Sequence, residues 1–248
     1  MAKFLNGSVI TATCWNQRLC TLKIDVNFPK FEAGQFVSIG LEIDGNPDMR
    51  PYSLINPPSS GFIEIYFNTV PEGSLSTRLY QCKAGDPLLV SPQAAGFFTL
   101  SEVPPQGKHL WLIATGTGIG PYLSMLATST PWQRFEKIVL VHSVSTADEL
   151  VYKSQIEILK ERHPDQLISV YCVTREKIAY GLQRRIQPCL ADGELEASAG
   201  IALSTDDSQV MLCGNRNMIH DVMTILAARG MKKNLRRNPG QITTEHYY

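Results

Sequence analysis

Apolar and polar residues follow different patterns in the two parts of the chain. In the first part, short runs at 8–13, 35–39, 61–67 and 87–90 alternate in character, and Gly, Pro, Asn and Asp separate them. Successive side chains of a strand point to opposite faces, so short runs with frequent turns predict an antiparallel barrel or sandwich. We therefore expect an N-terminal antiparallel β-barrel domain over residues 1–101.

The second part carries continuous apolar runs, at 109–114, 137–141, 167–173 and 210–213. Strands that are buried on both faces have this character. Helical patterns lie between or after these runs, beginning at Pro121, covering 154–162, and extending from Met218 to a C-cap at Gly230. Alternation of strands and helices predicts a C-terminal α/β domain with a parallel sheet over residues 102–248.

Composition narrows the classes of function. Of the 248 residues, 44% are hydrophobic and 19% are charged, and 23 basic residues balance 23 acidic ones. A general nucleic-acid binder would need a basic excess, so we expect no nucleic-acid partner. No run approaches the roughly 20 apolar residues of a membrane span, and the first residues lack the layout of a signal peptide, so we expect no membrane association. The six cysteines show no C-x-x-C spacing, which predicts no disulfide framework and no metal site. A reducing cytoplasm is therefore the expected compartment.

Two segments of the first domain carry groups suited to a flavin. The sequence RPYS at 50–53 combines a charged fork for a pyrophosphate, a ring that can pack on an isoalloxazine, and a hydroxyl that can reach its N5 atom. The sequence PEGSLSTR at 71–78 offers backbone amides and hydroxyls at a helix start, where phosphates bind. Each segment alone also fits an ordinary surface strand or a capped surface helix.

Two segments of the second domain are suited to a nucleotide. The sequence TGTGIGP at 115–121 follows an apolar run and opens a helix. Its glycines differ in spacing from the Rossmann and Walker A motifs, but they also let the backbone approach a pyrophosphate. Methyltransferases that bind S-adenosylmethionine carry GTGIG too. The sequence CGN at 213–215 ends another run, and ligands of parallel sheets bind at the carboxyl ends of strands. A small buried hydrophobe is the ordinary alternative for Cys213.

The chain closes with TEHYY at 244–248, and terminal aromatic residues are unusual for a disordered tail. The order of RPYS, TGTGIGP, CGN and TEHYY resembles the ferredoxin–NADP(+) reductase family, in the bacterial form with a C-terminal aromatic residue. The resemblance spans nearly the whole chain. It implies an FAD-dependent oxidoreductase that transfers a hydride between NADPH and FAD and passes single electrons to or from ferredoxin or flavodoxin.

The resemblance also implies roles for individual residues. Those implied to bind FAD are Arg50, Pro51, Tyr52, Ser53, Tyr66, Phe67, Asn68, Thr69, Gly73, Ser74, Leu75, Ser76, Thr117, Tyr247 and Tyr248. Those implied to bind NADP are Thr115, Gly116, Gly118, Gly120, Pro121, Ser145, Thr174, Arg175, Arg185, Cys213, Gly214 and Asn215. Those implied to be catalytic are Ser53, Cys213, Glu245 and Tyr248. Tyr248 would stack on the flavin until the nicotinamide displaces it, and Glu245 would relay protons or position the ring.

The choice between NADP and NAD depends on cations for the 2′-phosphate, which by resemblance are Arg175 and Arg185. The family pattern often has a further arginine where this chain has Ser145. A charge-assisted hydrogen bond contributes roughly 1.5–3 kcal/mol. Its loss would weaken NADP binding about ten- to a hundredfold. We expect NADP with weakened discrimination, unless Lys177 or Arg184 substitutes.

The basic segment 231–240 is interpreted either as a solvated tail or as a docking face for ferredoxin or flavodoxin. Acidic partners would bind it in a transient electrostatic complex. A monomer is the simple expectation for the oligomeric state. Other functions stay open: a flavin-binding redox sensor, the reductase component of an oxygenase system, or a free-flavin reductase. A methyltransferase would leave the first hundred residues unexplained.

Overall fold

The computed structural model of the chain describes residues 4–71 and 74–247, with the side chains of residues 74 and 247 left aside. The chain divides into two compact units, one made of residues 1–100 and 120–128 and the other of residues 101–119 and 129–248. The helix that follows the glycine-rich turn therefore groups with the N-terminal part of the chain.

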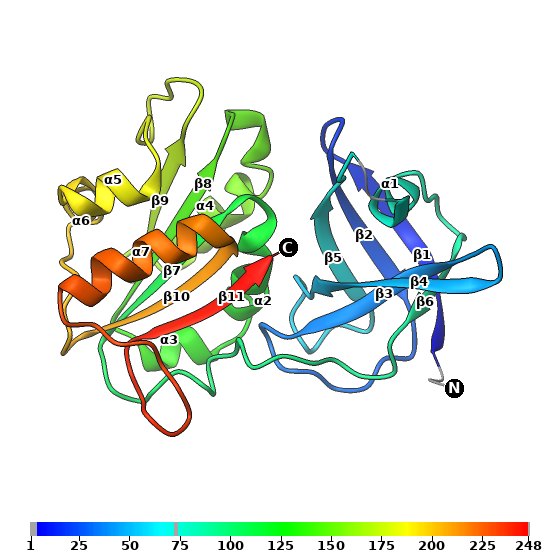
Figure 1. Cartoon of the computed structure of the whole chain (residues 1–248), viewed down its shortest axis with the longest axis horizontal. Helices are drawn as coiled ribbons and strands as arrows, with labels where there is room; N and C mark the ends of the chain where they lie inside the picture. Colours follow the sequence, from blue (N-terminus) through cyan, green and yellow to red (C-terminus); the bar gives the residue numbers. More distant parts are fainter. Residues whose placement is uncertain (1–3, 72–73, 248) are drawn as a thin grey trace. The chain divides into compact units, whose positions relative to one another are not determined.

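The first unit is built on a six-stranded sheet in the order β4-β3-β6-β1-β2-β5, in which neighbouring strands of the described residues pair antiparallel (Figure 1). Its elements are β1 (Leu5–Cys14), β2 (Leu19–Asp25), β3 (Phe36–Ile43), β4 (Asn46–Ser53), β5 (Ile63–Asn68), α1 (Ser74–Tyr80), β6 (Pro87–Val90) and α2 (Gly120–Leu126). The two ends of the sheet meet, because Leu54, directly after β4, pairs with Ile65 of β5. The predicted antiparallel barrel is confirmed.

The interior of this barrel holds one apolar cluster to which every strand except β4 contributes a buried residue. Leu75 and Leu79 of α1 belong to the same cluster, so this short helix is held by burial of one face. Strand β2 was not predicted from the sequence. Its first four residues, 19–22, are all buried, so they lack the alternation that marks a half-buried strand.

The second unit is an α/β structure whose five-stranded parallel sheet has the order β11-β10-β7-β8-β9 (Figure 1). Its strands are β7 (His109–Thr115), β8 (Lys137–Val144), β9 (Leu167–Val173), β10 (Ser208–Asn215) and β11 (Ile242–Tyr247). Its α-helices are α3 (Thr130–Arg134), α4 (Lys153–Arg162), α5 (Ile186–Ala191), α6 (Glu194–Ala199) and α7 (Arg216–Ala228), with short 3-10 helices η1 (Gly116–Ile119) and η2 (Ala147–Glu149). The parallel sheet predicted from the apolar runs is confirmed.

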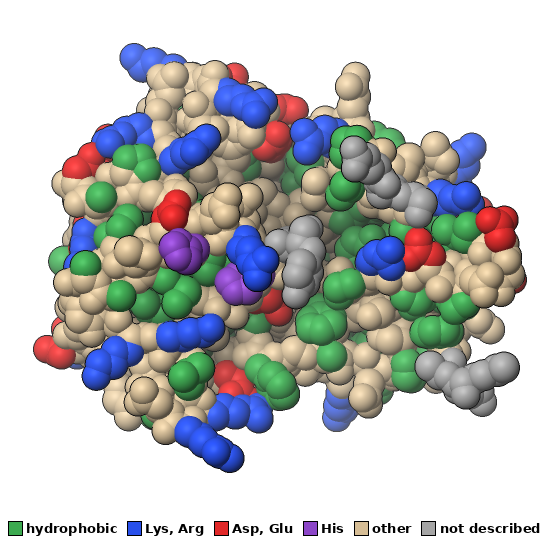
Figure 2. Space-filling model, viewed as in Figure 1, with side chains coloured by type: hydrophobic (Ala, Val, Ile, Leu, Met, Phe, Trp, Pro, Cys, Tyr) green, Lys and Arg blue, Asp and Glu red, His purple; other side chains and the backbone are tan. Residues whose placement is uncertain are grey.

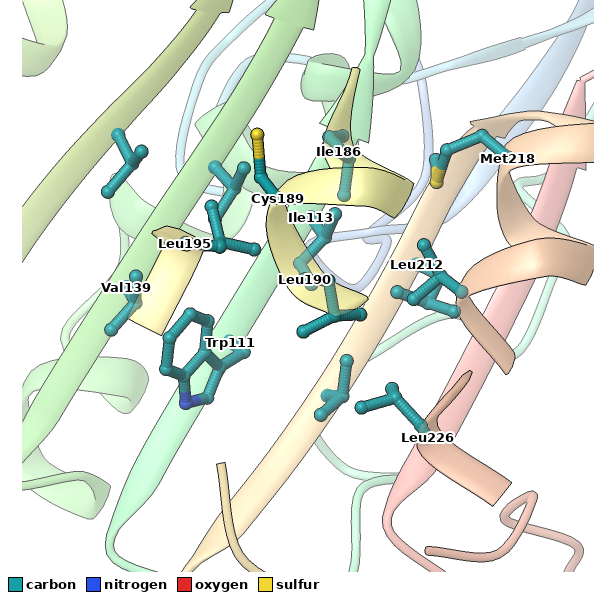
Figure 3. Packing of buried hydrophobic residues seen from close by; sticks show 14 of the residues in the cluster. Trp111, Ile113, Val139, Ile186, Cys189, Leu190, Leu195, Leu212, Met218 and Leu226 are labelled. Carbon is teal, nitrogen blue, oxygen red and sulfur yellow. The ribbon is translucent and has the colours of Figure 1, made fainter. Parts of the chain in front are cut away.

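Helices α5, α6 and α7 cover one face of this sheet. Trp111 and Leu212 of the sheet pack with Leu190, Leu195 and Leu226 of these helices (Figure 3). All five side chains are fully buried. This burial removes a large apolar area from water and fixes the strands whose carboxyl ends carry the residues expected to bind the nucleotide.

The C-terminal segment 242–247, which the sequence pattern does not mark as a strand, is the edge strand β11. It pairs in parallel with β10 over its whole length, from Val210 opposite Ile242 to Asn215 opposite Tyr247. None of the helices in the described ranges has the length and apolar character needed to cross a lipid bilayer.

Candidate functional site

The order of the parallel sheet changes direction at β7. Strands β8 and β9 extend the sheet on one side of β7, and β10 and β11 extend it on the other. Ligands of open α/β sheets bind at such a switch point, outside the carboxyl ends of the strands. The two segments that the sequence singles out, 115–121 and 213–215, begin at the carboxyl ends of the central strand β7 and its neighbour β10.

Glycine allows these two segments to lie against each other. A Cβ atom added to Gly118 would lie 2.7 Å from the carbonyl oxygen of Cys213 and 2.8 Å from the Cα atom of Gly214. Gly214 has φ +122°, and its added Cβ would lie 2.3 Å from Oγ1 of Thr115. That hydroxyl oxygen accepts a hydrogen bond from the backbone N–H of Asn215, at 2.8 Å. The result is a side-chain-poor cradle of backbone, which fits the close approach of a pyrophosphate.

His142 of β8 fixes this cradle from within the sheet. Its Nε2 atom lies 2.9 Å from the carbonyl oxygen of Gly116, and its side chain is almost fully buried. Burial lowers the pKa of His142 from its ordinary 6.5 to about 4, so the ring is neutral at physiological pH and Nε2–H donates to the turn. Sequence analysis did not identify this residue. The signal was a histidine inside an otherwise apolar buried run.

Asn215 has a role in the helix that follows it. Its side-chain oxygen accepts hydrogen bonds from the backbone N–H groups of Asn217 (2.9 Å) and Met218 (3.2 Å), which makes it the N-cap of α7. Asn215 is therefore both a predicted NADP-binding residue and the N-cap of α7.

Ser145 and Arg175, two of the residues proposed to lie near the 2′-phosphate, follow the carboxyl ends of β8 and β9. The backbone N–H of Arg175 donates to the carbonyl oxygen of Ser145 at 2.9 Å, and that of Thr174 donates to Val144 at 3.1 Å, so the structure brings these segments together. Arg175 and Arg185 are both exposed. Arg185 directly precedes α5. In the segment before it, Leu182 forms a parallel bridge with Cys172 of β9.

Carboxylates rather than cations hold the turn that contains Ser145. Oε2 of Glu149 accepts a hydrogen bond from the backbone N–H of Ser145 at 3.0 Å. Glu176 accepts one from the backbone N–H of Ala147. The sequence pattern indicates neither contact: Glu149 lies in the short helix η2 just after Ser145, and Glu176 lies in the loop after β9.

Arg184, which the sequence suggested as a substitute cation, is engaged elsewhere. Its Nη1 atom lies 2.6 Å from a carboxylate oxygen of Asp192 and 2.6 Å from one of Glu194. These two carboxylates balance its charge. Lys177 is exposed in the loop after Arg175. Of the two suggested substitutes, Lys177 is therefore better placed than Arg184 to bind a phosphate.

The predicted catalytic residues of the second unit lie side by side. Cys213 of β10 and Glu245 of β11 are partners in the parallel register. Cys213 is fully buried and Glu245 is half-buried. His246 follows on the exposed edge, and partial burial together with the charges of Arg216 and Lys233 lowers its pKa. Tyr248 lies outside the described residues, and of Tyr247 only the backbone is described.

In the first unit, the RPYS segment ends β4. Arg50 is exposed, and its Nη1 atom lies 2.7 Å from Oδ1 of Asp48 and 2.8 Å from the carbonyl oxygen of Met49. The ring of Tyr52 packs edge-on against Phe67, with ring centroids 5.6 Å apart. Burial raises the pKa of Tyr52 to about 12, so its hydroxyl stays a hydrogen-bond donor. Ser53 is buried.

The other predicted flavin residues come from β5, α1 and the turn after β7. Tyr66 and Phe67 are buried in β5, and Asn68 ends that strand. Thr69 follows and donates its backbone N–H to the carbonyl oxygen of Arg18 at 2.8 Å. The remaining predicted flavin residues are distributed as follows: Leu75 and Ser76 are buried in α1, Ser74 begins that helix, Gly73 lies outside the described residues, and Thr117 lies in η1. Gly120 and Pro121, predicted to bind NADP, begin α2.

The two units match two families of oxidoreductase domains. Residues 8–95 match the oxidoreductase FAD-binding domain, and residues 112–224 match the oxidoreductase NAD-binding domain. These matches define the class of protein, a two-domain flavin- and nicotinamide-nucleotide-dependent oxidoreductase.

Relatives over the full length define the family. The chain is 42% identical over 249 residues to the flavodoxin/ferredoxin–NADP reductase of Escherichia coli strain K12, with all of both chains covered. It is 33% identical to the ferredoxin–NADP reductase of Pseudomonas aeruginosa, covering all of this chain and 99% of that one. Among solved structures, the ferredoxin NADP+ reductase of Neisseria gonorrhoeae with bound FAD and NADP is 29% identical, with a TM-score of 0.94 and all of both chains covered. The chain belongs to the flavodoxin/ferredoxin–NADP reductase family.

Proposed function

We propose that this protein is an FAD-dependent reductase that exchanges electrons between NADPH and a small electron carrier, ferredoxin or flavodoxin. The observation that carries the proposal is the glycine cradle at the switch point of the parallel sheet. There Gly118 lies directly against Cys213 and Gly214. Full-length relatives that are named flavodoxin/ferredoxin–NADP reductase support the same function.

The chain's own residues bind and orient the reactants. The backbone of 116–118 and 213–215 receives the nucleotide, and Arg175, Arg185 and the turn at Ser145 receive its adenosine end. Arg50, Tyr52 and Ser53 are the residues that would hold the flavin: Arg50 offers a charged fork for the pyrophosphate, and Tyr52 and Ser53 offer a ring and a hydroxyl for the isoalloxazine. The bound flavin supplies hydride acceptance and one-electron release. By the resemblance, Glu245, the register partner of Cys213, would relay protons or position the flavin ring, and Tyr248 would stack on the flavin until the nicotinamide displaces it.

Nucleotide choice is the finer part of the proposal. Two exposed arginines favour NADPH, while the uncharged Ser145 and the carboxylates of Glu149 and Glu176 at the same turn weaken the preference. A carboxylate near the ribose accepts a hydrogen bond from a 2′-hydroxyl and repels a 2′-phosphate. We therefore propose NADPH as the substrate, with appreciable use of NADH.

The test is to mix the FAD-bound protein anaerobically with NADPH, and in parallel with NADH, and to follow the visible absorption of the flavin. Faster bleaching by NADPH supports the proposal. Replacement of Arg175 by Ala should slow bleaching at low NADPH concentration and leave the NADH reaction unchanged. Absence of bleaching with either nucleotide would favour the flavin-binding redox sensor instead.

The protein partner is proposed to be an acidic electron carrier that docks on segment 231–240. Lys232, Lys233, Arg236 and Arg237 are exposed in this segment. Figure 2 shows Lys and Arg side chains over the loop that precedes β11. Arg236 is partly neutralised, because Oε1 of Glu102 lies 2.5 Å from its Nη2 atom and Oε2 lies 3.0 Å from its Nε atom. Arg237 and the two lysines then provide more of the attraction than Arg236 does.

Charge reversal separates docking from chemistry. Replacing both Lys233 and Arg237 by Glu should raise the KM for ferredoxin or flavodoxin and leave reduction of a small dye unchanged, because only the protein acceptor needs the basic surface. A matched reversal of Lys160 and Arg162 on α4 should change neither. An unchanged KM in the first variant would exclude this docking face. A monomer working in the cytoplasm remains our expectation for the setting.

A further inference from the structure

Two cysteines close the hairpin formed by β1 and β2. Cys14 is the last residue of β1, and Cys20 lies directly opposite it in β2. Their sulfur atoms are 3.6 Å apart. Cys14 is exposed and Cys20 is fully buried. Neither residue belongs to the flavin or nucleotide sites described above, and all six cysteines of the chain are free thiols.

The backbone at this position has the spacing that a disulfide needs. The adjacent pair, Trp15 and Leu19, is joined by a backbone hydrogen bond of 2.9 Å from the N–H of Trp15. Bonded and non-bonded pairs alternate in an antiparallel ladder, so Cys14 and Cys20 form a non-hydrogen-bonded pair, with Cα atoms about 4.5 Å apart. That separation lies at the short end of the roughly 4.4–6.8 Å range of disulfides. Rotation of the side chains is sufficient to bring the sulfurs together.

Surrounding contacts hold the pair in place. Asn16 shapes the turn, because its side-chain oxygen accepts hydrogen bonds from the N–H groups of Arg18 and Leu19, both at 2.9 Å. The hydroxyl of Tyr80, at the end of α1, donates to the carbonyl oxygen of Asn16 at 2.6 Å. The turn is thus fixed from two directions, and the two thiols face each other without a need for backbone movement.

We propose that Cys14 and Cys20 form a thiol-modification site that a low-molecular-weight disulfide, such as glutathione disulfide, converts reversibly into an intramolecular disulfide. The Cys14 thiolate attacks one sulfur of glutathione disulfide, which forms a mixed disulfide and releases one glutathione. The Cys20 thiolate then attacks the Cys14 sulfur and releases the second glutathione. The two cysteine thiols lose two electrons and two protons, and one glutathione disulfide becomes two glutathione thiols.

The order of the two steps follows from exposure. Cys14 meets solvent and therefore meets the oxidant first, whereas Cys20 has no solvent-accessible surface. Burial raises the pKa of the Cys20 thiol, and the neighbouring Cys14 raises it further, so Cys20 is the poorer nucleophile of the two for the first step. Formation of the mixed disulfide then removes the neighbouring thiol and positions a sulfur for attack.

A second cysteine pair serves as an internal control. The side chains of Cys172 and Cys189 also interact, and burial is the main cause of the raised pKa of both. Both are fully buried, so no exposed sulfur is present to start the exchange. Proximity alone predicts oxidation of both pairs, whereas our proposal predicts oxidation only of Cys14 and Cys20.

The test is to incubate the FAD-bound protein with glutathione disulfide, block free thiols, and digest with trypsin without reduction. Cleavage after Lys3, Arg18 and Lys23 places Cys14 in peptide 4–18 and Cys20 in peptide 19–23. We expect mass spectrometry to show these two peptides joined, and separated again after treatment with excess reduced glutathione. Cys14→Ser, at an exposed position that keeps the fold, should abolish the joined species.

Cys82 provides the decisive comparison, because it is buried near Cys20 and lies in the separate peptide 79–83. Cys82→Ser should leave the joined peptides unchanged. The proposal is overturned if peptide 19–23 is found joined to 79–83, if Cys14 stops at the mixed disulfide with glutathione, or if all three thiols stay unmodified.

Discussion

Buried, neutral His142 should make the stability of the nucleotide-binding unit depend on pH. The pKa of His142 is lowered from 6.5 to about 4 by burial. Between these values the unfolded chain binds a proton that the folded chain does not, so stability is fully present above pH 6.5 and is lost as the pH falls through this window. For these two pKa values, linkage gives a loss of about 2 kcal/mol between about pH 7.5 and about pH 5.

The measurement is urea unfolding of wild type and His142→Gln at these two pH values, followed by tryptophan fluorescence. Trp111 is fully buried in the same unit and reports its unfolding. Glutamine keeps an N–H donor for the carbonyl of Gly116 but does not titrate, so the variant should lose about 2 kcal/mol less than wild type on acidification. His220→Gln, at a side chain 80% exposed, should keep the wild-type dependence. Equal pH dependence in wild type and His142→Gln would refute the reasoning.

Three further predictions concern the same unit. Gly118→Ala should destabilise the fold by about 1–3 kcal/mol and raise the Kd for NADPH in an absorbance titration, because the added Cβ would overlap the backbone of Cys213. The control Gly61→Ala should do neither, because its added Cβ has nothing within 4 Å. Asn215→Ala should remove the N-cap of α7 and cost about 1 kcal/mol, seen as a lower Tm. Ser145→Arg should tighten NADPH binding about ten- to a hundredfold with no gain for NADH; no tightening would mean that Glu149 and Glu176 neutralise the new cation.

Much of the fold could be predicted because its strongest signals are local. Four strands of the parallel sheet are continuous apolar runs, and burial on both faces is what produces such runs. Strand β11 escaped prediction for the opposite reason. Residues 243–246 are Thr, Thr, Glu and His, and an edge strand with one sheet neighbour carries polar residues that resemble a tail.

The candidate site was predictable only in part, because only some of its signals are local in the sequence. Gly118 marks a close backbone approach by itself, whereas the surface that it approaches, Cys213 and Gly214, is supplied by a strand about a hundred residues later in the chain. The contact of Glu176 with the turn after Ser145 depends on tertiary packing, because it joins the segments that follow two different strands. No spacing rule along the sequence carries such contacts.

The pairing of β11 with β10 affects how the protein can be engineered. Residues 242–247 cover one edge of β10, whose other edge is occupied by β7. Deleting 242–248 would expose a row of unpaired N–H and C=O groups along a strand that is almost entirely buried, which is a template for aggregation. A tag for purification or immobilisation on an electrode is therefore better attached before β1, and shortened variants should stop no earlier than Tyr247.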